Sequence, residues 1–393
     1  MKKNKYFSTK TCSLFIYIHY LFVFMRFKNL GYANQNKFIF LKNLCIFVQT
    51  FVNNSMATQK ANINDIVSRT GLSISTVSRV LNGKAEQFRI GKKSQQKIIE
   101  AAKELNYIPN HFAANLRSGK SHTIALIVPS LNNPFFADLA STINSEIRKF
   151  GYTTMITDSD EDLRVEEMAL NQVMSRNIEG LVIAPCGNKW EHIKQLHDLG
   201  LPIICIDRYF EELDIPFVST DNYDGAYTAT KYLIEYGHKN IACIQGVQQS
   251  TPNRLRIKGF KKAMEDAGLQ EYKIVGDDFS VQNGYLETRL LLQQKEKPTA
   301  IFTLSNTIAM GCMKALKELN VEIPEDISLI TFDDHPYLDY LSTPLSCIAQ
   351  PVSDISKIAV KFLFSKLNST EAMIQQILLK PEIKIKKSIR MIL

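Results

Sequence analysis

Residues 63–82 read INDIVSRTGLSISTVSRVLN, and this stretch decides the fold of the amino-terminal part of the chain. Apolar residues recur at helical spacing, which predicts a short helix from about Asn64 to Thr70. Gly71 then ends this helix, because the residue just past a helix end often takes a positive φ, which glycine tolerates. Ser73 supplies a hydroxyl that can cap a second helix. Two short helices joined by a glycine turn predict a helix-turn-helix, with an ordinary helical hairpin as the alternative.

The predicted second helix separates apolar from polar side chains. Val77, Val80 and Leu81 fall on one face, whereas small polar residues and Arg79 fall largely elsewhere. Such a polar helix surface fits the major groove of DNA, where serine and asparagine can meet base edges and arginine favours guanine O6 and N7.

Charge is distributed unevenly along the 393 residues. Residues 56–120 hold eleven Lys and Arg against four Asp and Glu, and residues 1–55 hold eight Lys and Arg with no acidic residue. Because the whole chain carries +8, the remainder from residue 121 carries −7. A basic segment beside an acidic bulk suits a polyanion-binding head on a separate body, and a merely solvated basic face is the alternative.

The seven cysteines form no CxxC pair and show no zinc-site spacing. Several of them sit inside apolar runs, so we interpret them as reduced thiols in a reducing compartment and expect no metal site.

Residues 1–55 do not look like part of the fold. Their apolar run SLFIYIHYLFVFM has thirteen residues, whereas a membrane-spanning helix needs about 20. Met56 reads well as an independent start. We therefore interpret residues 1–55 as an extension from a misassigned start codon, with a membrane anchor and a disordered tail as alternatives.

A third amphipathic helix and a short linker complete the amino-terminal part. The pattern of Gln95–Leu105 predicts the helix, which would close a head domain spanning residues 56–109. Residues 110–120 follow as a hinge, in which HFAANL (111–116) would form about two helical turns. A helix that short is marginal in water, so it could act as a switch by folding only against DNA or its twin; a plain linker is the alternative.

From residue 121 onwards, apolar strands alternate with helices. This pattern predicts an α/β fold with parallel sheets covered on both faces. It restarts after about residue 220, so we expect a body of residues 121–393 in two lobes, one of about 121–220 plus 350–393, with strands crossing between the lobes, and one of 221–350. Asp, Asn and Arg residues fall at strand ends, where open sheets of this kind bind ligands, and could bind the hydroxyls of a small polar molecule.

Several motifs together resemble the lactose-repressor family of bacterial transcription regulators (LacI/GalR). The most specific are STVSRVLN at 75–82 and LNYIPN at 105–110; NPFF at 133–136 and FDD at 332–334 support them. The resemblance covers the chain apart from residues 1–55. It implies a helical head, a hinge helix and a two-lobed body like a periplasmic sugar-binding protein. It also implies a cytoplasmic homodimer that binds a near-palindromic double-stranded DNA operator and a small effector, with no cofactor.

The resemblance assigns DNA-binding roles residue by residue. The positions expected to read bases, to contact phosphates or to enter the minor groove are Ile74, Ser75, Thr76, Ser78, Arg79, Asn82, Tyr107, Asn110, Ala113 and Leu116. Within this set Leu116 matches a leucine wedged between base pairs, and Ala113 packs beside it. Two departures stand out: the loop Ala85–Gly91 is longer than usual, and Asn115 replaces the more usual Arg or Gln.

The resemblance likewise assigns effector contacts around the cleft. The matching positions are Phe135, Phe136, Arg208, Asp221, Arg256, Phe279, Asn306 and Asp333. Ser250 and Pro252 stand where the purine-binding branch of the family carries Arg and Thr, which favours a saccharide over a purine. Instead of contacting an effector, each of these residues could form a salt bridge between the lobes or cap a strand end. Phe135 could instead be an ordinary residue of the hydrophobic core.

The sequence bears on three classes of function, namely a regulator, a sugar-binding transport protein and an enzyme. A ligand-controlled DNA-binding regulator, most simply a repressor, accounts for both the head and the body. A tethered or secreted sugar-binding protein of a transport system would explain the body and the apolar run, but not the head. No G-x-S-x-G, P-loop, HExxH or GxGxxG motif occurs on a strand–helix turn, so we expect no enzyme.

Overall fold

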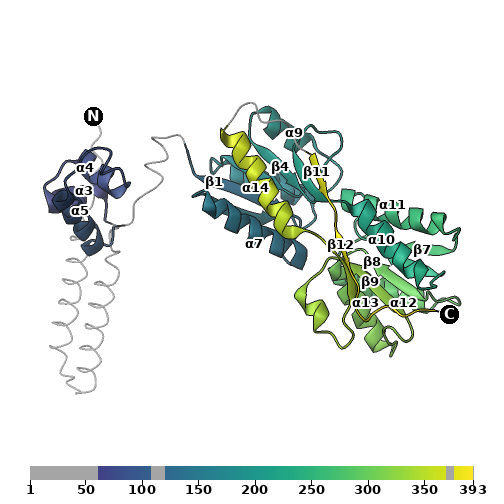
Figure 1. Ribbon diagram of the computed structural model, residues 1–393. Coiled ribbons are helices and arrows are strands. Elements are labelled where there is room, and N and C mark those ends of the chain that lie inside the picture. The colour runs from purple at the N-terminus through teal and green to yellow at the C-terminus, as the bar shows by residue number, and fades with distance from the viewer. Residues whose placement is uncertain (1–60, 108–119, 369–375, 393) are drawn as a thin grey trace, which may run out of the picture. The chain divides into compact units, whose positions relative to one another are not determined.

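The computed structural model describes residues 61–107, 120–368 and 376–392 (Figure 1). The chain divides into two compact units, residues 1–111 and 112–393, which are described separately below. The extension 1–55 and residues 110–119 of the predicted hinge, including Asn110, Ala113 and Leu116, lie outside the described residues. None of the helices within the described ranges is long and apolar enough to cross a membrane.

The described part of the first unit consists of three helices, α3 (Ile63–Thr70), α4 (Ile74–Leu81) and α5 (Lys92–Glu104). Gly71 ends α3 with φ of 69°, and the Ser73 hydroxyl accepts a hydrogen bond of 3.2 Å from the Thr76 N–H at the start of α4. These are the signals from which the helix-turn-helix was predicted, and the prediction is confirmed. The third helix begins at Lys92, three residues before its predicted start.

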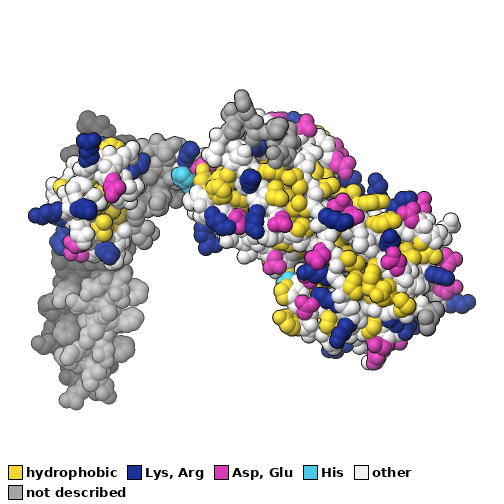
Figure 2. All heavy atoms as spheres, in the orientation of Figure 1, with side chains coloured by type: hydrophobic (Ala, Val, Ile, Leu, Met, Phe, Trp, Pro, Cys, Tyr) yellow, Lys and Arg dark blue, Asp and Glu magenta, His cyan; other side chains and the backbone are white. Residues whose placement is uncertain are grey.

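One apolar cluster holds these helices together. Ile66, Val77 and Ile98, one from each helix, are fully buried, and Ala85 from the loop joins them. Burying large aliphatic side chains stabilises such a small unit by about 1.5–3 kcal/mol each. The packing uses one face of α4 only, so other α4 side chains stay exposed. Figure 2 shows Lys and Arg side chains spread over the visible face of this unit.

The first lobe of the second unit is built on a parallel six-stranded sheet in the order β11-β5-β4-β3-β1-β2. Its strands are β1 (Thr123–Val128), β2 (Thr153–Asp158), β3 (Gly180–Ile183), β4 (Ile203–Ile206), β5 (Phe217–Thr220) and β11 (Gln376–Leu379). Four helices cover it, namely α7 (Pro134–Lys149), α8 (Leu163–Met174), α9 (Glu191–Asp198) and α14 (Val352–Asn368). Helices α7 and α14 share one apolar cluster, and α8 and α9 share another, so the sheet is covered on both faces.

The second lobe repeats this plan with the sheet order β12-β10-β9-β8-β6-β7. Its strands are β6 (Ile241–Ile244), β7 (Tyr272–Val275), β8 (Ala300–Thr303), β9 (Ser328–Phe332), β10 (Ser346–Ala349) and β12 (Glu382–Lys384). Its helices are α10 (Asn222–Glu235), α11 (Thr251–Asp266), α12 (Val281–Leu292), α13 (Asn306–Glu318) and the 3₁₀ turn η1 (Pro336–Asp339). The predicted two-lobed α/β architecture is confirmed, because both sheets are buried between helices.

The chain crosses between the lobes three times, after β5, after β10 and after β11. Residues 350–393 were predicted to join the first lobe with strands crossing between the lobes, and the last of these residues lie in the second lobe. Strand β12 pairs antiparallel with β10 in the second sheet, and the Ile392 N–H donates to the Tyr236 carbonyl oxygen at 2.8 Å in the second lobe. A strand as short as β12 carries no periodic signal that could reveal its partner.

Candidate functional site

A cleft opens between the two lobes of the second unit. The first lobe contributes Asn133, Phe135, Phe136, Asp207 and Arg208. The second lobe contributes Pro252, Arg256, Phe279, Ser305 and Asp333, and Gln350 comes from a crossing segment. The cleft holds about 280 Å³ of space outside the protein atoms, part of it open to solvent.

Two aspartates occupy equivalent positions in the two lobes, because each directly follows a central strand of its sheet. Asp207 follows β4 with φ of 59° and Asp333 follows β9 with φ of 73°, a left-handed conformation that aspartate tolerates better than most residues. Both residues are only 3% exposed. Asp207 Oδ1 has no hydrogen-bond partner among the described residues. A buried acceptor without a partner is costly, so this oxygen is available to a hydroxyl donor in the cleft.

Burial also changes the acidity of these aspartates. It raises the pKa of Asp207 to about 6, although the cations of Arg208 and Arg256 pull it down. Burial likewise raises the pKa of Asp333, against the lowering effects of Arg256 and of a hydrogen bond from Gln350. Carboxylates whose ionised form is poorly solvated gain from a ligand that supplies hydrogen-bond donors.

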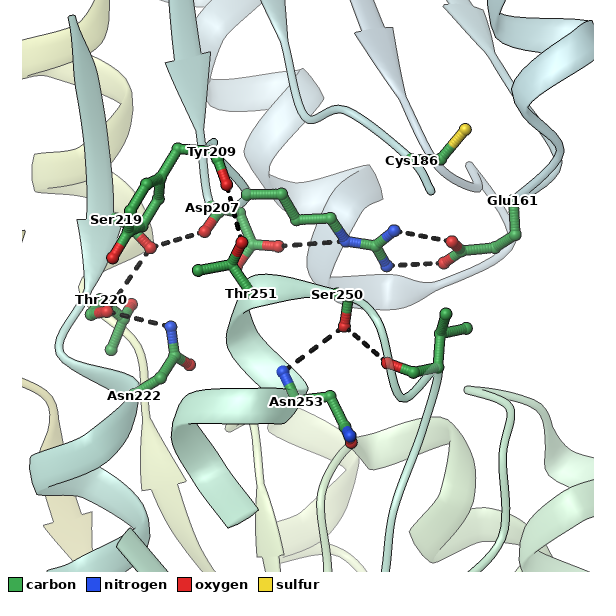
Figure 3. A network of polar contacts seen from close by, with 12 residues as sticks. Glu161, Cys186, Asp207, Tyr209, Ser219, Thr220, Asn222, Ser250, Thr251 and Asn253 are labelled. Atoms are coloured by element: carbon green, nitrogen blue, oxygen red, sulfur yellow. Dashed lines mark hydrogen bonds and ion pairs between the residues drawn. The ribbon is translucent and has the colours of Figure 1, made fainter. Parts of the chain in front are cut away.

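The Arg208 side chain lies between acidic groups and aromatic rings. Its two terminal nitrogens donate to the Glu161 carboxylate at 2.6 Å each, and its Nε lies 3.9 Å from Asp207 Oδ2. Figure 3 shows Glu161 and Asp207 on opposite sides of the guanidinium group. Its central carbon is 5.6 Å from the ring centroid of Phe136 and 5.7 Å from that of Phe279. Burial opposes the charge on Arg208, but Glu161 outweighs it and raises the pKa.

Two hydrogen bonds and an aromatic ring fix the orientation of the Arg256 side chain. Its Nε donates to Asn222 Oδ1 at 2.8 Å, and one terminal nitrogen donates to the Leu304 carbonyl oxygen at 2.6 Å. The guanidinium group stacks on Phe332, with 3.7 Å between its central carbon and the ring centroid. Burial lowers the pKa of Arg256, against Asp333 and Asp207. The remaining N–H donors make no hydrogen bond within the described residues, so they can bind a ligand in the cleft.

Gln350 connects the cleft to the crossing segments. Its Nε2 donates to Asp333 Oδ1 at 2.6 Å, and its Oε1 accepts from the Thr220 hydroxyl at 2.5 Å. The other oxygen of Asp333 accepts from the Asn306 N–H at 3.3 Å. Asp333 is therefore oriented by two donors on different segments.

Six of the eight positions assigned to the effector line the cleft, namely Phe135, Phe136, Arg208, Arg256, Phe279 and Asp333. Asp221 does not, because its Oδ1 caps α10 by accepting from the Asp224 N–H at 2.9 Å. Asn306 lies behind Asp333 at the start of α13, is fully buried, and has no side-chain partner among the described residues. Phe135 also packs in the hydrophobic core of the first lobe, which was the alternative considered for this residue.

Sequence reasoning missed four residues that line the cleft, namely Asn133, Pro252, Ser305 and Gln350. Ser305 comes two residues after β8, whereas Asp207 and Arg208 after β4 and Asp333 after β9 were among the strand-end residues expected to bind a ligand. Gln350 directly follows β10, but this strand was not predicted, so the strand-end signal was not applied to it. Across the described ranges no group of His, Cys, Asp or Glu side chains has a metal-binding arrangement.

The first unit presents a separate candidate site on α4. Ile74 is 51% exposed, and Ser75, Arg79 and Asn82 are exposed as well. Thr76, Ser78 and Tyr107 are half-buried. The Asn82 Nδ2 donates to the Ser78 carbonyl oxygen at 2.7 Å, so this amide is partly engaged within the helix end. The exposed face of α4 together with its C-cap Asn82 thus combines one apolar, two polar and one cationic side chain.

Comparison with known proteins identifies both units. Residues 62–110 match the model described as bacterial regulatory proteins of the lacI family, and residues 121–356 match periplasmic binding proteins and the sugar-binding domain of the LacI family. The ribose operon repressor of Haemophilus influenzae is 32% identical over 85% of this chain and 99% of its own length. The transcriptional regulator DegA of Bacillus subtilis is 31% identical over 84% of this chain and 98% of its own. Both are named as regulators and not as enzymes.

Solved structures agree with these relatives. The lac repressor dimer bound to operator covers 84% of this chain and all of its own, with a TM-score of 0.75 and 23% identity, which shows a shared fold. A LacI-family regulator from Enterococcus faecium with bound ribose covers 69% of this chain and 99% of its own, with a TM-score of 0.64 and 28% identity.

Proposed function

Because this chain belongs to the LacI family of bacterial regulatory proteins, we propose that it is a cytoplasmic, dimeric transcriptional repressor whose operator binding is controlled by ribose or a similar neutral pentose. The three-helix head binds a near-palindromic operator through α4, and the sugar occupies the cleft of the body. The sugar changes operator affinity to the extent that its own affinity differs between the two states of the protein. The match of residues 62–110 argues against a transport protein.

The observation that carries the sugar assignment is the pairing of buried carboxylates and arginines in one cleft. Asp207 and Asp333 can accept hydrogen bonds from neighbouring hydroxyls, and Arg208 and Arg256 can donate to the sugar oxygens. Charge-assisted hydrogen bonds of this kind are about twice as strong as neutral ones. The ring of Phe136 offers an apolar surface for a sugar face. A ribose repressor and a ribose-bound structure among the similar proteins support the same class of ligand.

The charges of the cleft favour a neutral sugar over a sugar phosphate. Arg208 and Arg256 carry two positive charges, which the carboxylates of Asp207, Asp333 and Glu161 more than offset. Glu161 occupies both terminal nitrogens of Arg208, the group that a phosphate would otherwise bind bidentately. A phosphate would therefore enter a cleft without spare positive charge.

Calorimetric titration and operator binding test this proposal together. We expect ribose to bind the full-length chain with micromolar or tighter affinity, and ribose 5-phosphate and purine bases to bind at least about 100-fold more weakly, a difference of about 2.7 kcal/mol. Fluorescence anisotropy on an operator selected from random DNA should show an affinity that changes on adding ribose. Tight binding of a purine or a phosphorylated sugar instead of ribose would contradict the assignment.

Sugar binding is expected to weaken below pH 6. Asp207 faces Arg208, Arg256, Asp333 and Glu161, and its pKa of about 6 lies above its usual value of 3.8. The protonated form is a poorer acceptor for hydroxyls, so the affinity for ribose should fall by up to about tenfold per pH unit below 6.

The raised pKa of Asp207 also affects the stability of the fold. Asp207 stabilises the fold below pH 3.8, and this stability is lost as the pH rises through 6.

Titrations between pH 5 and pH 8 measure this effect. The Asp207→Asn variant is the control, because it should bind more weakly at pH 8 and lose the pH-dependent step assigned to Asp207. An affinity for ribose that is constant from pH 5 to pH 8 in the unmodified protein would contradict the role of Asp207.

A further inference from the structure

The loop between α4 and α5, residues 83–91, is held to the rest of the head by hydrogen bonds and apolar packing. The Ile90 N–H donates to the Ala85 carbonyl oxygen at 2.9 Å, and the Lys84 N–H donates to the Arg79 carbonyl oxygen at 2.9 Å. The Gln95 side chain donates to the Ile90 carbonyl oxygen at 2.7 Å, and Ala85 packs in the apolar cluster. The loop is therefore fastened at both ends to the helices that it joins.

This loop places an aromatic ring beside the second helix of the helix-turn-helix. Phe88 is 44% exposed, although its own loop is fastened to the core. The central carbon of the Arg79 guanidinium group lies 3.9 Å from the Phe88 ring centroid. An arginine at this distance from an aromatic ring gains from the attraction of its charge to the ring and from stacking of the two surfaces.

The stack leaves the hydrogen-bonding edge of Arg79 free. The guanidinium donors lie in its plane, so a ring that packs on its face leaves them available. No hydrogen bond or ion pair joins the Arg79 side chain to any residue in the described parts of the chain, and the side chain is exposed. A long side chain that is oriented before binding loses less conformational freedom when the complex forms. Arg79 thus combines restricted motion with unused donors.

We propose that Phe88 is a positioning residue for operator recognition, which holds Arg79 so that its edge can donate to O6 and N7 of one guanine. This inference rests on the proposed DNA-binding function and adds a residue outside the helix-turn-helix to it. The bidentate contact of arginine with guanine requires the guanidinium plane to lie near the plane of the base, and a stacked ring restricts that plane. The longer loop thereby contributes to sequence specificity without touching a base.

The test compares variants of Phe88 in the full-length chain. An operator is first selected from random DNA, and each of its G·C pairs is then replaced in turn. Phe88→Leu keeps an apolar side chain of similar size without a π-face, and Phe88→Trp keeps the π-face. Anisotropy should show that Phe88→Leu weakens binding about three- to tenfold on the selected operator, but less than twofold on the operator that lacks the guanine read by Arg79. Phe88→Trp should bind within about twofold of the unmodified protein, because tryptophan is the strongest partner for a cation.

The double variant separates positioning from direct contact. Arg79→Met should abolish the preference for one guanine, and adding Phe88→Leu should then cost nothing further. An unchanged affinity in Phe88→Leu would overturn the inference. An equal loss on every operator that persists in the Arg79→Met background would also overturn it, since Phe88 would then contact DNA itself or only stabilise the head. If the unmodified chain enriches no DNA sequence, the proposed function fails, and this inference fails with it.

Discussion

Replacing Asp333 with asparagine is expected to weaken ribose binding about 100-fold and to make operator affinity insensitive to ribose. The Asp333 carboxylate accepts from Gln350 Nε2 at 2.6 Å and from the Asn306 N–H at 3.3 Å. An asparagine amide has one oxygen, so its NH₂ group would face one of these donors, and the charge that strengthens bonds to sugar hydroxyls would be lost. Hydrogen bonds to charged groups contribute about 1.5–3 kcal/mol each, so two weakened contacts account for the factor. Asparagine also tolerates the φ of 73° at this position.

Calorimetry with ribose, and operator anisotropy with and without ribose, measure the two effects. Asp334→Asn is the matched control, because the neighbouring carboxylate pairs with Lys384 at 2.8 Å and Lys386 at 3.5 Å and does not line the cleft. The control should bind ribose like the unmodified protein. Operator binding without ribose should be unchanged in both variants. A ribose affinity in Asp333→Asn equal to that of the control would remove Asp333 from the binding site.

The parts of the fold that were predicted correctly have local signals. The cap at Ser73 and the left-handed Gly71 define the turn between α3 and α4 within a few residues. Continuous apolar runs such as β4 identify strands that are buried on both faces. By contrast, β7 was not predicted, because as an edge strand it is half-buried throughout and lacks such a run. The position of β12 depends on pairing with β10, which no local pattern reveals.

Strand ends predicted where the cleft lies, but not which polar residues face it. Arg208 and Asp333 follow central strands and line the cleft. Asp221 follows β5 in the same way, yet β5 lies beside the edge strand β11 and the carboxylate caps a helix. A carboxylate that caps a helix and one that binds a ligand look alike in sequence. Both are acidic residues that follow a strand and use a side-chain oxygen as a hydrogen-bond acceptor. Gln350 was missed because its two contacts depend on how the crossing segments meet.

Replacing Glu161 with glutamine is expected to shift the preference of the cleft toward phosphorylated sugars by about 100-fold. Glu161 binds both terminal nitrogens of Arg208 at 2.6 Å. Removing its charge leaves one more positive charge available in the cleft. A unit charge about 6 Å from a phosphate contributes about 2.8 kcal/mol at an effective dielectric constant of 20, which is about a 100-fold change. Binding of ribose itself should weaken only modestly, because Arg208 then loses part of its orientation.

Parallel titrations with ribose and ribose 5-phosphate measure this preference. Glu179→Gln is the matched control, since Glu179 accepts from the His122 N–H at 2.6 Å and from the Tyr152 hydroxyl at 2.9 Å, away from the cleft. The control should keep the preference for the neutral sugar. An unchanged preference in Glu161→Gln would mean that the size of the cleft excludes the phosphate. A smaller preference for ribose over ribose 5-phosphate would mean that the Glu161 carboxylate excludes the phosphate. One acidic residue outside the pocket lining would then set the class of sugar to which the regulator responds.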